Sequence, residues 1–337
     1  MQVTTIGLDI AKNVFQVHGV DARGRVVLRK RLARGKVLAW FANLPRSRVG
    51  LEACGGAHHW ARELQALGHD ARLMPPQYVK AYVKTNKHDA ADAEACCEAV
   101  QRPGMRFVPV KTKNQQATLM LHRVRDQLIG QRTATINALR GHLTEFGIVA
   151  AQRQAGMRSL LALIGEAEGG IPPLAREVLQ TLATHLRELE SKLAVLDRRL
   201  VALTRTDQTC RTLSQVPGVG PVIATAFAAT VPDAGAFRSG RHLAAWLGLV
   251  PRQHSSGGKV RHLGLSKRGD GYLRRQLIHG ARALVWRTPA REGKLRLWIN
   301  GLRQRRPFNV AVAAVANKLA RILWAMLRHG EAYRAAV

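Results

Sequence analysis

The hydrophobic positions of residues 1–110 fall into short runs that alternate between two periods. Apolar, β-branched runs bounded by turn residues predict strands, and stretches with apolar residues three or four apart predict helices. The predicted strands lie at 3–8, 14–20, 26–31, 49–52 and 70–74, and the predicted helices at 36–44, 58–67 and from residue 89 onward. Three strands in hairpin order, followed by strand–helix alternation, predict a mixed sheet with helices on its faces, hence an α/β domain over residues 1–110.

The pattern becomes helical from about residue 115 to residue 206. Leucines repeat here with alternating gaps of three and four residues, as in the seam of a coiled coil, at Leu179, Leu182, Leu186, Leu189, Leu193, Leu196, Leu200 and Leu203. Such a seam predicts a paired helix, whose partner is either the stretch 119–143 of the same chain or a second copy. Residues 111–206 are therefore predicted to form a helical, coiled-coil linker and dimerisation region.

The third predicted domain, residues 207–337, is mostly helical. Residues 216–221, Val-Pro-Gly-Val-Gly-Pro, precede an apolar helical stretch and have the pattern of a helix-hairpin-helix. In that motif Gly218 and Gly220 would let backbone N–H groups at a helix N-terminus approach a phosphate closely. Similar turns also occur in helix pairs that bind nothing.

The charge of the chain is strongly one-sided. The 337 residues are 46% hydrophobic, enough for a large core, yet 53 Lys and Arg stand against 22 Asp and Glu, a formal net charge of +31. A polyanionic partner is the natural explanation. Together with Gly218 and Gly220, the residues predicted to contact nucleic acid are Arg252, Lys259, Arg261, Lys267, Arg268, Arg274 and Arg275.

Membrane and metal-thiolate classes fit less well. The most apolar late stretch, 308–327, is interrupted by Asn317, Lys318 and Arg321, so it predicts a buried or amphipathic helix. The first residues enter a strand without the pattern of a signal peptide. The four cysteines show no CxxC spacing, which predicts reduced, mostly buried thiols of a cytosolic protein and no zinc site.

Four carboxylates carry the candidate chemistry. Asp9 and Glu52 each end an apolar strand, and Asp89 and Asp92 lie three apart on one face of an alanine-rich helix. Oxygen ligands of this kind hold Mg²⁺, for which Mn²⁺ can substitute. Taken alone, the helical pair is also explained by helix capping, which stabilises a helix by about 1 kcal/mol. The joint occurrence of two strand-end acids with a helical pair favours a metal site.

A glycine-rich loop is the second candidate. Residues 247–259 place Ser255 and Ser256 beside His254 among several cations. A serine hydroxyl needs a base, a metal or a positive field before it attacks phosphorus. By composition alone the stretch is a surface turn.

Seven short motifs now point the same way. They are residues 7–12 (Gly-Leu-Asp-Ile-Ala-Lys), 51–55 (Leu-Glu-Ala-Cys-Gly), 86–93 (Asn-Lys-His-Asp-Ala-Ala-Asp-Ala), 216–220, 237–238 (Phe-Arg), 245–251 (Ala-Trp-Leu-Gly-Leu-Val-Pro) and 255–259 (Ser-Ser-Gly-Gly-Lys). The chain resembles, over almost its whole length, the DEDD-type insertion-sequence transposases of the one-ten family, which are bridge-RNA-guided serine recombinases.

The resemblance implies a ribonuclease H/RuvC-like fold for residues 1–110, with a catalytic Mg²⁺ site made by Asp9, Glu52, Asp89 and Asp92. It implies a serine nucleophile that falls on Ser256 by its position after Pro251, with the adjacent Ser255 as a rival. It also implies donor and target DNA, a non-coding bridge RNA, a homodimer or tetramer, and a bacterial cytosolic location.

The function expected from sequence is Mg²⁺-dependent DNA cleavage and strand exchange through a phosphoserine link. One alternative is a hydrolytic, RuvC-like junction resolvase in which water attacks and Ser256 is structural. The other is a non-enzymatic architectural protein that binds nucleic acid with its helix-hairpin-helix and basic C-terminal region, indifferent to the four carboxylates.

Overall fold

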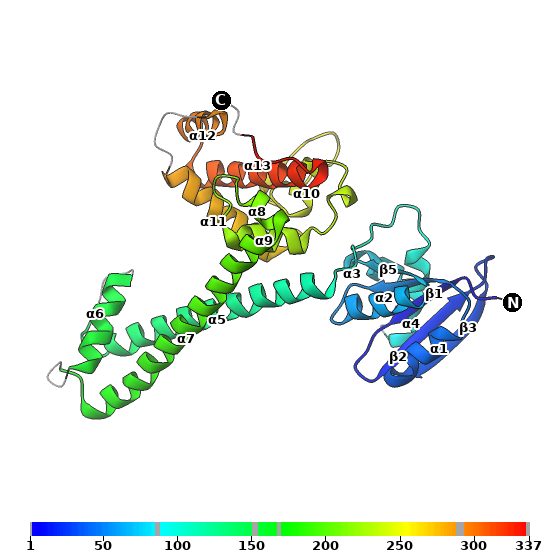
Figure 1. Cartoon of the computed structure of the whole chain (residues 1–337), viewed down its shortest axis with the longest axis horizontal. Helices are drawn as coiled ribbons and strands as arrows, with labels where there is room; N and C mark the ends of the chain where they lie inside the picture. Colours follow the sequence, from blue (N-terminus) through cyan, green and yellow to red (C-terminus); the bar gives the residue numbers. More distant parts are fainter. Residues whose placement is uncertain (1, 85–87, 150–153, 167–169, 288–292, 335–337) are drawn as a thin grey trace. The chain divides into compact units, whose positions relative to one another are not determined.

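The computed structural model describes residues 2–84, 88–149, 154–166, 170–287 and 293–334. The chain divides into two compact units, residues 1–114 and residues 115–337 (Figure 1). The first boundary lies close to the predicted one at residue 110. The second unit contains both the predicted helical region and the predicted C-terminal domain, and the division of these two by function stays a prediction.

Unit 1 is built on one five-stranded sheet with the strand order β3-β2-β1-β4-β5. Strand β1 pairs antiparallel with β2 and parallel with β4, so the sheet is mixed, as predicted. The strands are β1 (Thr5–Asp9), β2 (Val14–Val20), β3 (Val26–Ala33), β4 (Arg48–Glu52) and β5 (Asp70–Met74). The short helices are η1 (Arg34–Lys36), α1 (Val37–Ala42), α2 (Ala57–Ala66), α3 (Pro76–Val79) and η2 (Lys80–Tyr82), and the longer helix α4 is Asp89–Val100.

The two faces of this sheet are covered differently. Side chains such as Ile6, Leu8 and Leu51 point to one face and form a large core with Phe41 and Trp60 of α1 and α2. Since side chains alternate along a strand, the residues between them face the other way. That face carries glycine at the centre of both β1 and β4, and helix α4 covers it.

Helix α4 lies directly on the backbone of the sheet. A Cβ atom added to Gly7 would come within 2.0 Å of the Ala93 carbonyl oxygen, and one added to Gly50 within 2.8 Å of the Cys96 carbonyl oxygen. Only glycine permits this approach. Cys96 and Cys97 are buried in the same contact, in agreement with the prediction of buried thiols, whereas Cys54 is exposed.

Unit 2 begins with long helices that pack on one another. Its helices and strands are α5 (Lys113–Thr144), α6 (Gln154–Gly165), α7 (Pro173–Thr206), α8 (Gln208–Leu213), α9 (Pro221–Thr230), η3 (Ala234–Ala236), α10 (Gly240–Trp246), β6 (Pro251–Gln253), β7 (His262–Leu265), α11 (Gly271–Arg287), α12 (Lys294–Arg305) and α13 (Phe308–His329). One core joins Leu139 and Leu143 of α5 and Leu160 of α6 with Leu179 and Leu186 of α7. These seam leucines therefore pack within the chain, one of the two arrangements left open by the sequence.

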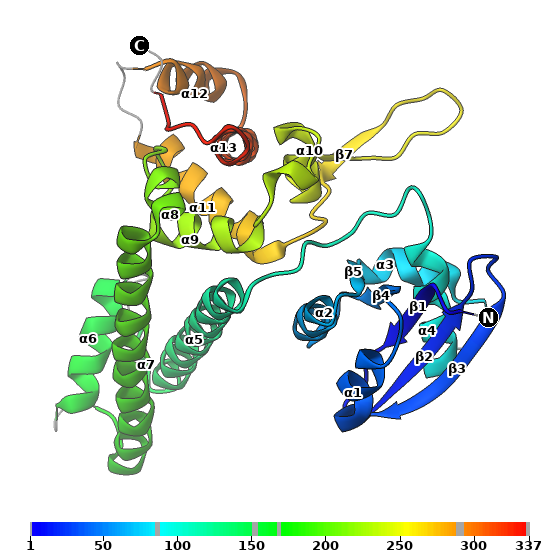
Figure 2. The ribbon, with the colours of Figure 1, turned by 45° about the vertical axis from the view of Figure 1, so that its right-hand side comes forward.

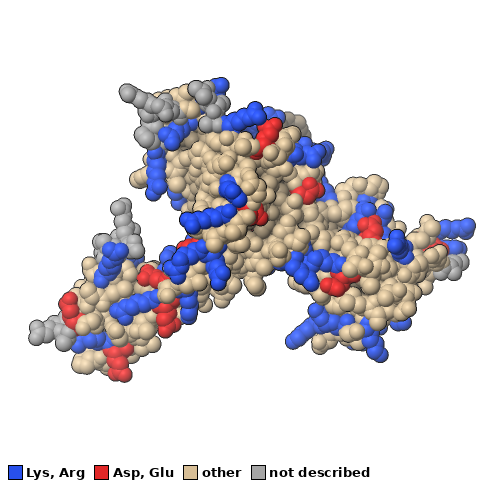
Figure 3. Space-filling view, in the orientation of Figure 1, with Lys and Arg blue, Asp and Glu red and all other residues tan. Residues whose placement is uncertain are grey.

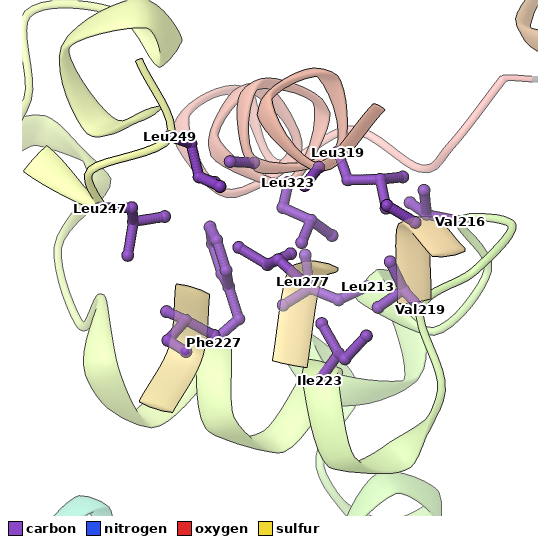
Figure 4. Close-up of a cluster of buried hydrophobic side chains, with 14 of the residues drawn as sticks. Leu213, Val216, Val219, Ile223, Phe227, Leu247, Leu249, Leu277, Leu319 and Leu323 are labelled. Atoms are coloured by element: carbon purple, nitrogen blue, oxygen red, sulfur yellow. The ribbon is translucent and has the colours of Figure 1, made fainter. Parts of the chain in front are cut away.

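The rest of unit 2 is a helical bundle around a second core. Leu213 of α8, Phe227 of α9, Leu277 of α11 and Leu319 of α13 converge in it (Figure 4). Helix α13 is the only helix among the described residues that is long and apolar enough to cross a membrane. Its apolar face, which includes Leu319 and Leu323, is fully buried here, as expected of a core helix.

A buried histidine ties the long helices to the bundle. His122 of α5 is 1% exposed, and its two ring nitrogens lie 2.9 Å from the Tyr272 hydroxyl and 3.0 Å from the Thr225 hydroxyl. Burial, with a contribution from Arg125, lowers the pKa of His122 to about 4, so the ring is neutral at pH 7. Arg125 in turn bonds Asp197 of α7 at 2.6 Å.

We predict that Gly7→Ala strongly destabilises unit 1. The new methyl group would overlap the backbone of α4, which can relieve the overlap only by moving away from the sheet. Misfitting groups in a packed core cost about 1–3 kcal/mol, and a backbone overlap should reach the upper end. Differential scanning calorimetry of the full chain would measure the loss.

Gly35→Ala is the matched control, because a Cβ atom at Gly35 meets no atom within 4 Å. Equal melting temperatures for the two variants would contradict the close contact between helix and sheet.

Candidate functional site

The glycine contact sets the height of α4 against the sheet and thereby gathers the acids. Gly7 and Gly50 are paired across the parallel strands, and Asp9 and Glu52 follow each of them by two residues. Two residues advance a strand by about 6.6 Å. Helix α4 contacts the two glycines through Ala93 and Cys96. One helical turn, about 5.4 Å, towards the N-terminus of α4 leads from these residues to Asp89 and Asp92. The four predicted acids therefore lie at one edge of unit 1.

Helix α4 does not use Asp89 as its cap, contrary to the capping explanation. The N-cap is His88, whose Nδ1 atom accepts a hydrogen bond from the Ala91 N–H at 3.2 Å. Asp89 is the first helical residue and is exposed, and Asp92 is partly exposed. Residues 86 and 87, which begin the sequence motif, lie outside the described residues. Both carboxylates are thus free of the capping role.

The charges of the three other acids all affect the pKa of Asp9. Burial raises its pKa, the negative charges of Asp92, Asp89 and Glu52 raise it further, and together they bring the pKa of Asp9 to about 6. A carboxylate that resists ionisation because of like charges is a place where a cation would be strongly favoured.

The carboxylates share an edge without forming a closed cage. Among the described residues, no three His, Cys, Asp or Glu side chains are arranged closely enough to hold a metal ion. The donor set is nevertheless entirely oxygen, which suits Mg²⁺ or Mn²⁺. The three acids around Asp9 raise its pKa after burial does, so negative charge is concentrated at this edge.

The predicted serine loop is a β-hairpin. Strands β6 and β7 pair antiparallel, and the Lys259 N–H donates to the Ser256 carbonyl oxygen at 3.0 Å across the tip. Gly257 and Gly258 between them both have positive φ, +55° and +76°, as a two-residue type I′ turn requires. Figure 2 shows the loop before β7 extending away from α10.

The two serines differ in their surroundings. The Ser255 Oγ atom accepts a hydrogen bond from the Gln253 side chain at 2.9 Å. No such bond is recorded for the Ser256 hydroxyl within the described part of the chain, and residues 251–262 are all exposed. The hairpin therefore presents Ser256 at its tip, next to the turn.

The base of the hairpin is anchored to the bundle. A Cβ atom on Gly248 would lie 2.4 Å from the Arg268 nitrogen, so the segments before and after the hairpin touch through their backbones. Arg274 links these two segments by hydrogen bonds. Its Nη1 atom donates to the carbonyl oxygens of Leu247 at 3.0 Å and Arg268 at 2.6 Å.

The cations predicted to bind nucleic acid fall into two groups. Those on the hairpin and at its base are exposed: Arg252, Lys259, Arg261, Lys267 and Arg268. Arg274 serves the fold as described, and Arg275 makes a two-pronged ion pair with Asp126 of α5 at 2.7 and 2.8 Å. Figure 3 shows both signs of charge mixed along α6 and α7, with mainly Lys and Arg around α12.

The glycine turn at 216–221 has a packing explanation that the sequence did not reveal. Gly218 has φ +80°. A Cβ atom added to Gly280 of α11 would lie 2.2 Å from the carbonyl oxygen of Gly218. Gly218 thus allows the turn to press against α11. Gly220 is exposed at the N-cap of α9. Phosphate binding by either glycine stays a prediction.

Both units match known protein families. Residues 6–148 match the DEDD family model of IS110 elements, described as "Transposase". Residues 210–295 match a second model, described as "Transposase IS116/IS110/IS902 family". The first match includes all four carboxylates, and the second includes the hairpin.

Similar proteins extend the likeness to the full length. The chain is 51% identical to a "Probable family 20 transposase" of Pseudomonas aeruginosa, with 99% of each chain covered. It is 42% identical to the "Transposase for insertion sequence element IS1111A" of Coxiella burnetii, covering 98% of this chain and 92% of the relative. It is 40% identical to the transposase of element IS1328 of Yersinia enterocolitica, with 98% of each covered.

An acid-edged α/β unit joined to a basic helical unit, with these matches, defines a DNA transposase, an enzyme that cuts and rearranges DNA. The chain belongs to the IS110 family of insertion-sequence transposases.

We predict that Asp9→Asn stabilises the chain at high pH. The folded-state pKa of about 6 exceeds the ordinary 3.8, so the protonated form contributes stability below 3.8 that is lost as the pH rises through 6. Asparagine mimics the protonated form. Without divalent cations, the melting temperature of the variant should lie roughly 2–4 °C above that of wild type at pH 8. At pH 4 the two melting temperatures should be equal.

Asp70→Asn supplies the opposite control. Burial pushes the pKa of Asp70 up, but hydrogen bonds from Arg72 and Arg48 outweigh it and hold the pKa below its usual value. This variant should therefore melt below wild type at pH 8. A destabilised Asp9→Asn at that pH would argue against repulsion among the acids.

We also predict that two arginines near the hairpin behave oppositely. Arg261→Gln, on the exposed tip, should weaken duplex DNA binding and reduce the slope of log affinity against log salt by about 0.9, because one phosphate contact is lost. Arg274→Gln should instead lower stability by about 2 kcal/mol, since it leaves two carbonyls without their donor. Filter binding over a salt series and thermal melting separate the two effects. A salt slope unchanged in Arg261→Gln would remove the hairpin from the DNA interface.

Proposed function

We propose that this transposase excises and inserts its element by divalent-metal-dependent cleavage and exchange of DNA strands through a serine nucleophile. The observation that carries the proposal is the electrostatic coupling of Asp9 to Glu52, Asp89 and Asp92. The strand order with acids at the ends of β1 and β4, facing a helix, supports a ribonuclease H/RuvC-like assignment for unit 1.

The four carboxylates would hold Mg²⁺, or Mn²⁺ as a substitute. When bound there, the ion supplies a positive charge that polarises the scissile phosphate and stabilises the leaving oxygen. Asp9 binds in its ionised form, so binding displaces the proton that its raised pKa retains near pH 6. Glu52, Asp89 and Asp92 would supply further carboxylate oxygens to the ion.

Ser256 is the proposed nucleophile. Its hydroxyl oxygen bonds to the phosphorus as the bond from that phosphorus to one deoxyribose oxygen breaks. The proton given up by the serine hydroxyl balances the one taken up by the deoxyribose oxygen, which leaves as a free hydroxyl group. The phosphoserine retains the energy of the broken bond, so a second strand can be joined without an external energy source. Supporting features are the exposed tip position of Ser256 and the bond from Gln253 that engages Ser255 instead.

The remaining partners follow from the same proposal. Donor and target DNA are bound by the exposed cations of the hairpin, and a non-coding bridge RNA pairs with both to select the sites. A homodimer, or a tetramer in the synaptic complex, lets the carboxylates of one subunit act with the serine of another. The enzyme works in the bacterial cytosol, at the nucleoid.

We predict that excision requires Asp9 and Ser256 but not Ser255. Cells carrying the gene with its natural flanks would be assayed by quantitative PCR for the junction of the excised circle. Asp9→Asn and Ser256→Ala should each reduce the junction at least about 1,000-fold, because each removes a member of one catalytic unit. Ser255→Ala should leave it within a few-fold of wild type.

The other outcomes are equally informative. A junction that survives Ser256→Ala would favour Ser255 or attack by water, as in a junction resolvase. No junction even in wild type would leave either an inactive element or the architectural role. A readout without catalysis tests the metal: millimolar Mg²⁺ should raise the melting temperature of wild type more than that of Asp9→Asn.

A further inference from the structure

One stripe of helix α11 is exposed and unlike the rest of the helix. Arg275, His279, Arg282 and Trp286 follow one another at intervals of four, three and four residues, so they share one face. The opposite face, which includes Leu277, is buried in the bundle core. The stripe is therefore the solvent side of a firmly packed helix.

The stripe ends in an aromatic pair. Trp286 is 78% exposed, the largest exposed fraction recorded for an aromatic side chain in the described residues. Its ring meets that of Phe308, the first residue of α13, at a centroid distance of 6.3 Å and an angle of 89°. Phe308 is itself 39% exposed, so the pair offers ring surface to solvent from a fixed position.

The described residues of the helices that carry this pair, α11 from residue 276 and α13, together with α12, bear cations and no acids. Residues 276–287 and 293–330 contain no acidic side chain, and their exposed cations are Arg282, Arg287, Lys294, Arg296, Arg303, Arg305, Arg306 and Arg328. Arg282 lies four residues from Trp286, about 6 Å along the helix. An apolar partner would gain nothing from these charges, whereas a polyanion with aromatic groups matches both features.

We propose that Trp286, with Phe308 behind it and Arg282 beside it, is a stacking platform for an unpaired stretch of the DNA being exchanged. Bases in a duplex hide their faces against one another, so an exposed ring is useful only where a strand has left its complement. Strand exchange requires such a stretch, and the inference therefore rests on the proposed function. The arginines bind the phosphates of the same strand while the ring holds a base.

The platform is tested by binding, without catalysis. Full-length protein is titrated against a fluorescein-labelled single-stranded DNA 20-mer and a blunt duplex of the same length, in the same salt. Trp286→Ala should weaken single-strand binding about 10-fold, as expected for the loss of one stacked base. Trp286→Phe should restore most of the affinity, and duplex binding should change less than about 2-fold.

Two controls keep the test specific. Met120→Ala removes another exposed apolar side chain, on α5, and should change neither affinity. Single-strand binding is measured without catalysis and the excision junction requires catalysis, so failure of the proposed serine chemistry is distinguishable from failure of the platform. Melting curves of each variant confirm that the fold is intact.

Several results would overturn the assignment. They are unchanged single-strand affinity in Trp286→Ala, an equal loss for single strand and duplex, or a Trp286 dependence seen only with an RNA 20-mer of the same sequence. Loss of binding to anionic phospholipid vesicles, with DNA affinity unchanged, would make the pair a membrane contact instead.

Discussion

The close contact between helix α4 and the sheet is the constraint on which the acidic site depends. Gly7 and Gly50 remove every side chain between the helix and strands β1 and β4, so backbone meets backbone. With no compressible layer between them, the helix has one height relative to the strands. That height places the first turn of α4 level with the strand ends, where Asp9 and Glu52 stand. A larger residue at either glycine would move two of the acids relative to the other two.

The same contact explains why the acids raise the pKa of Asp9. Burial raises the pKa of Asp9, and the negative charges of the three other carboxylates at this edge raise it further. Close to Asp89 and Asp92 in the sequence, Lys84 forms an ion pair with Glu94 of α4, at 3.4 Å. The acidic edge is therefore a local concentration of negative charge in a chain whose formal net charge is +31.

Much of unit 1 could be predicted from sequence, because alternation of apolar residues fixes strands and the acids end them. Every predicted strand lies within two residues of an observed one. What the sequence could not reveal are features made by tertiary contact. Gly7 and Gly50 are ordinary strand glycines until α4 lies on them. The N-cap of α4 is His88 and not Asp89, the residue of the alternative capping explanation, and the turn at Gly218 packs against Gly280. The one available signal was a glycine two residues before each strand-end acid.

The basic residues of unit 2 show how net charge divides between folding and binding. Arg274 and Arg275 stand next to each other in sequence, yet one bonds two carbonyls and the other pairs with Asp126, so both spend their charge inside the fold. Charge counted along a sequence therefore overstates the binding surface. What remains is the hairpin tip and the acid-free stretch around α12, where cations have no protein counter-charge among the described residues. Since exposed like charges repel one another, each of these two regions would gain stability from a polyanionic partner.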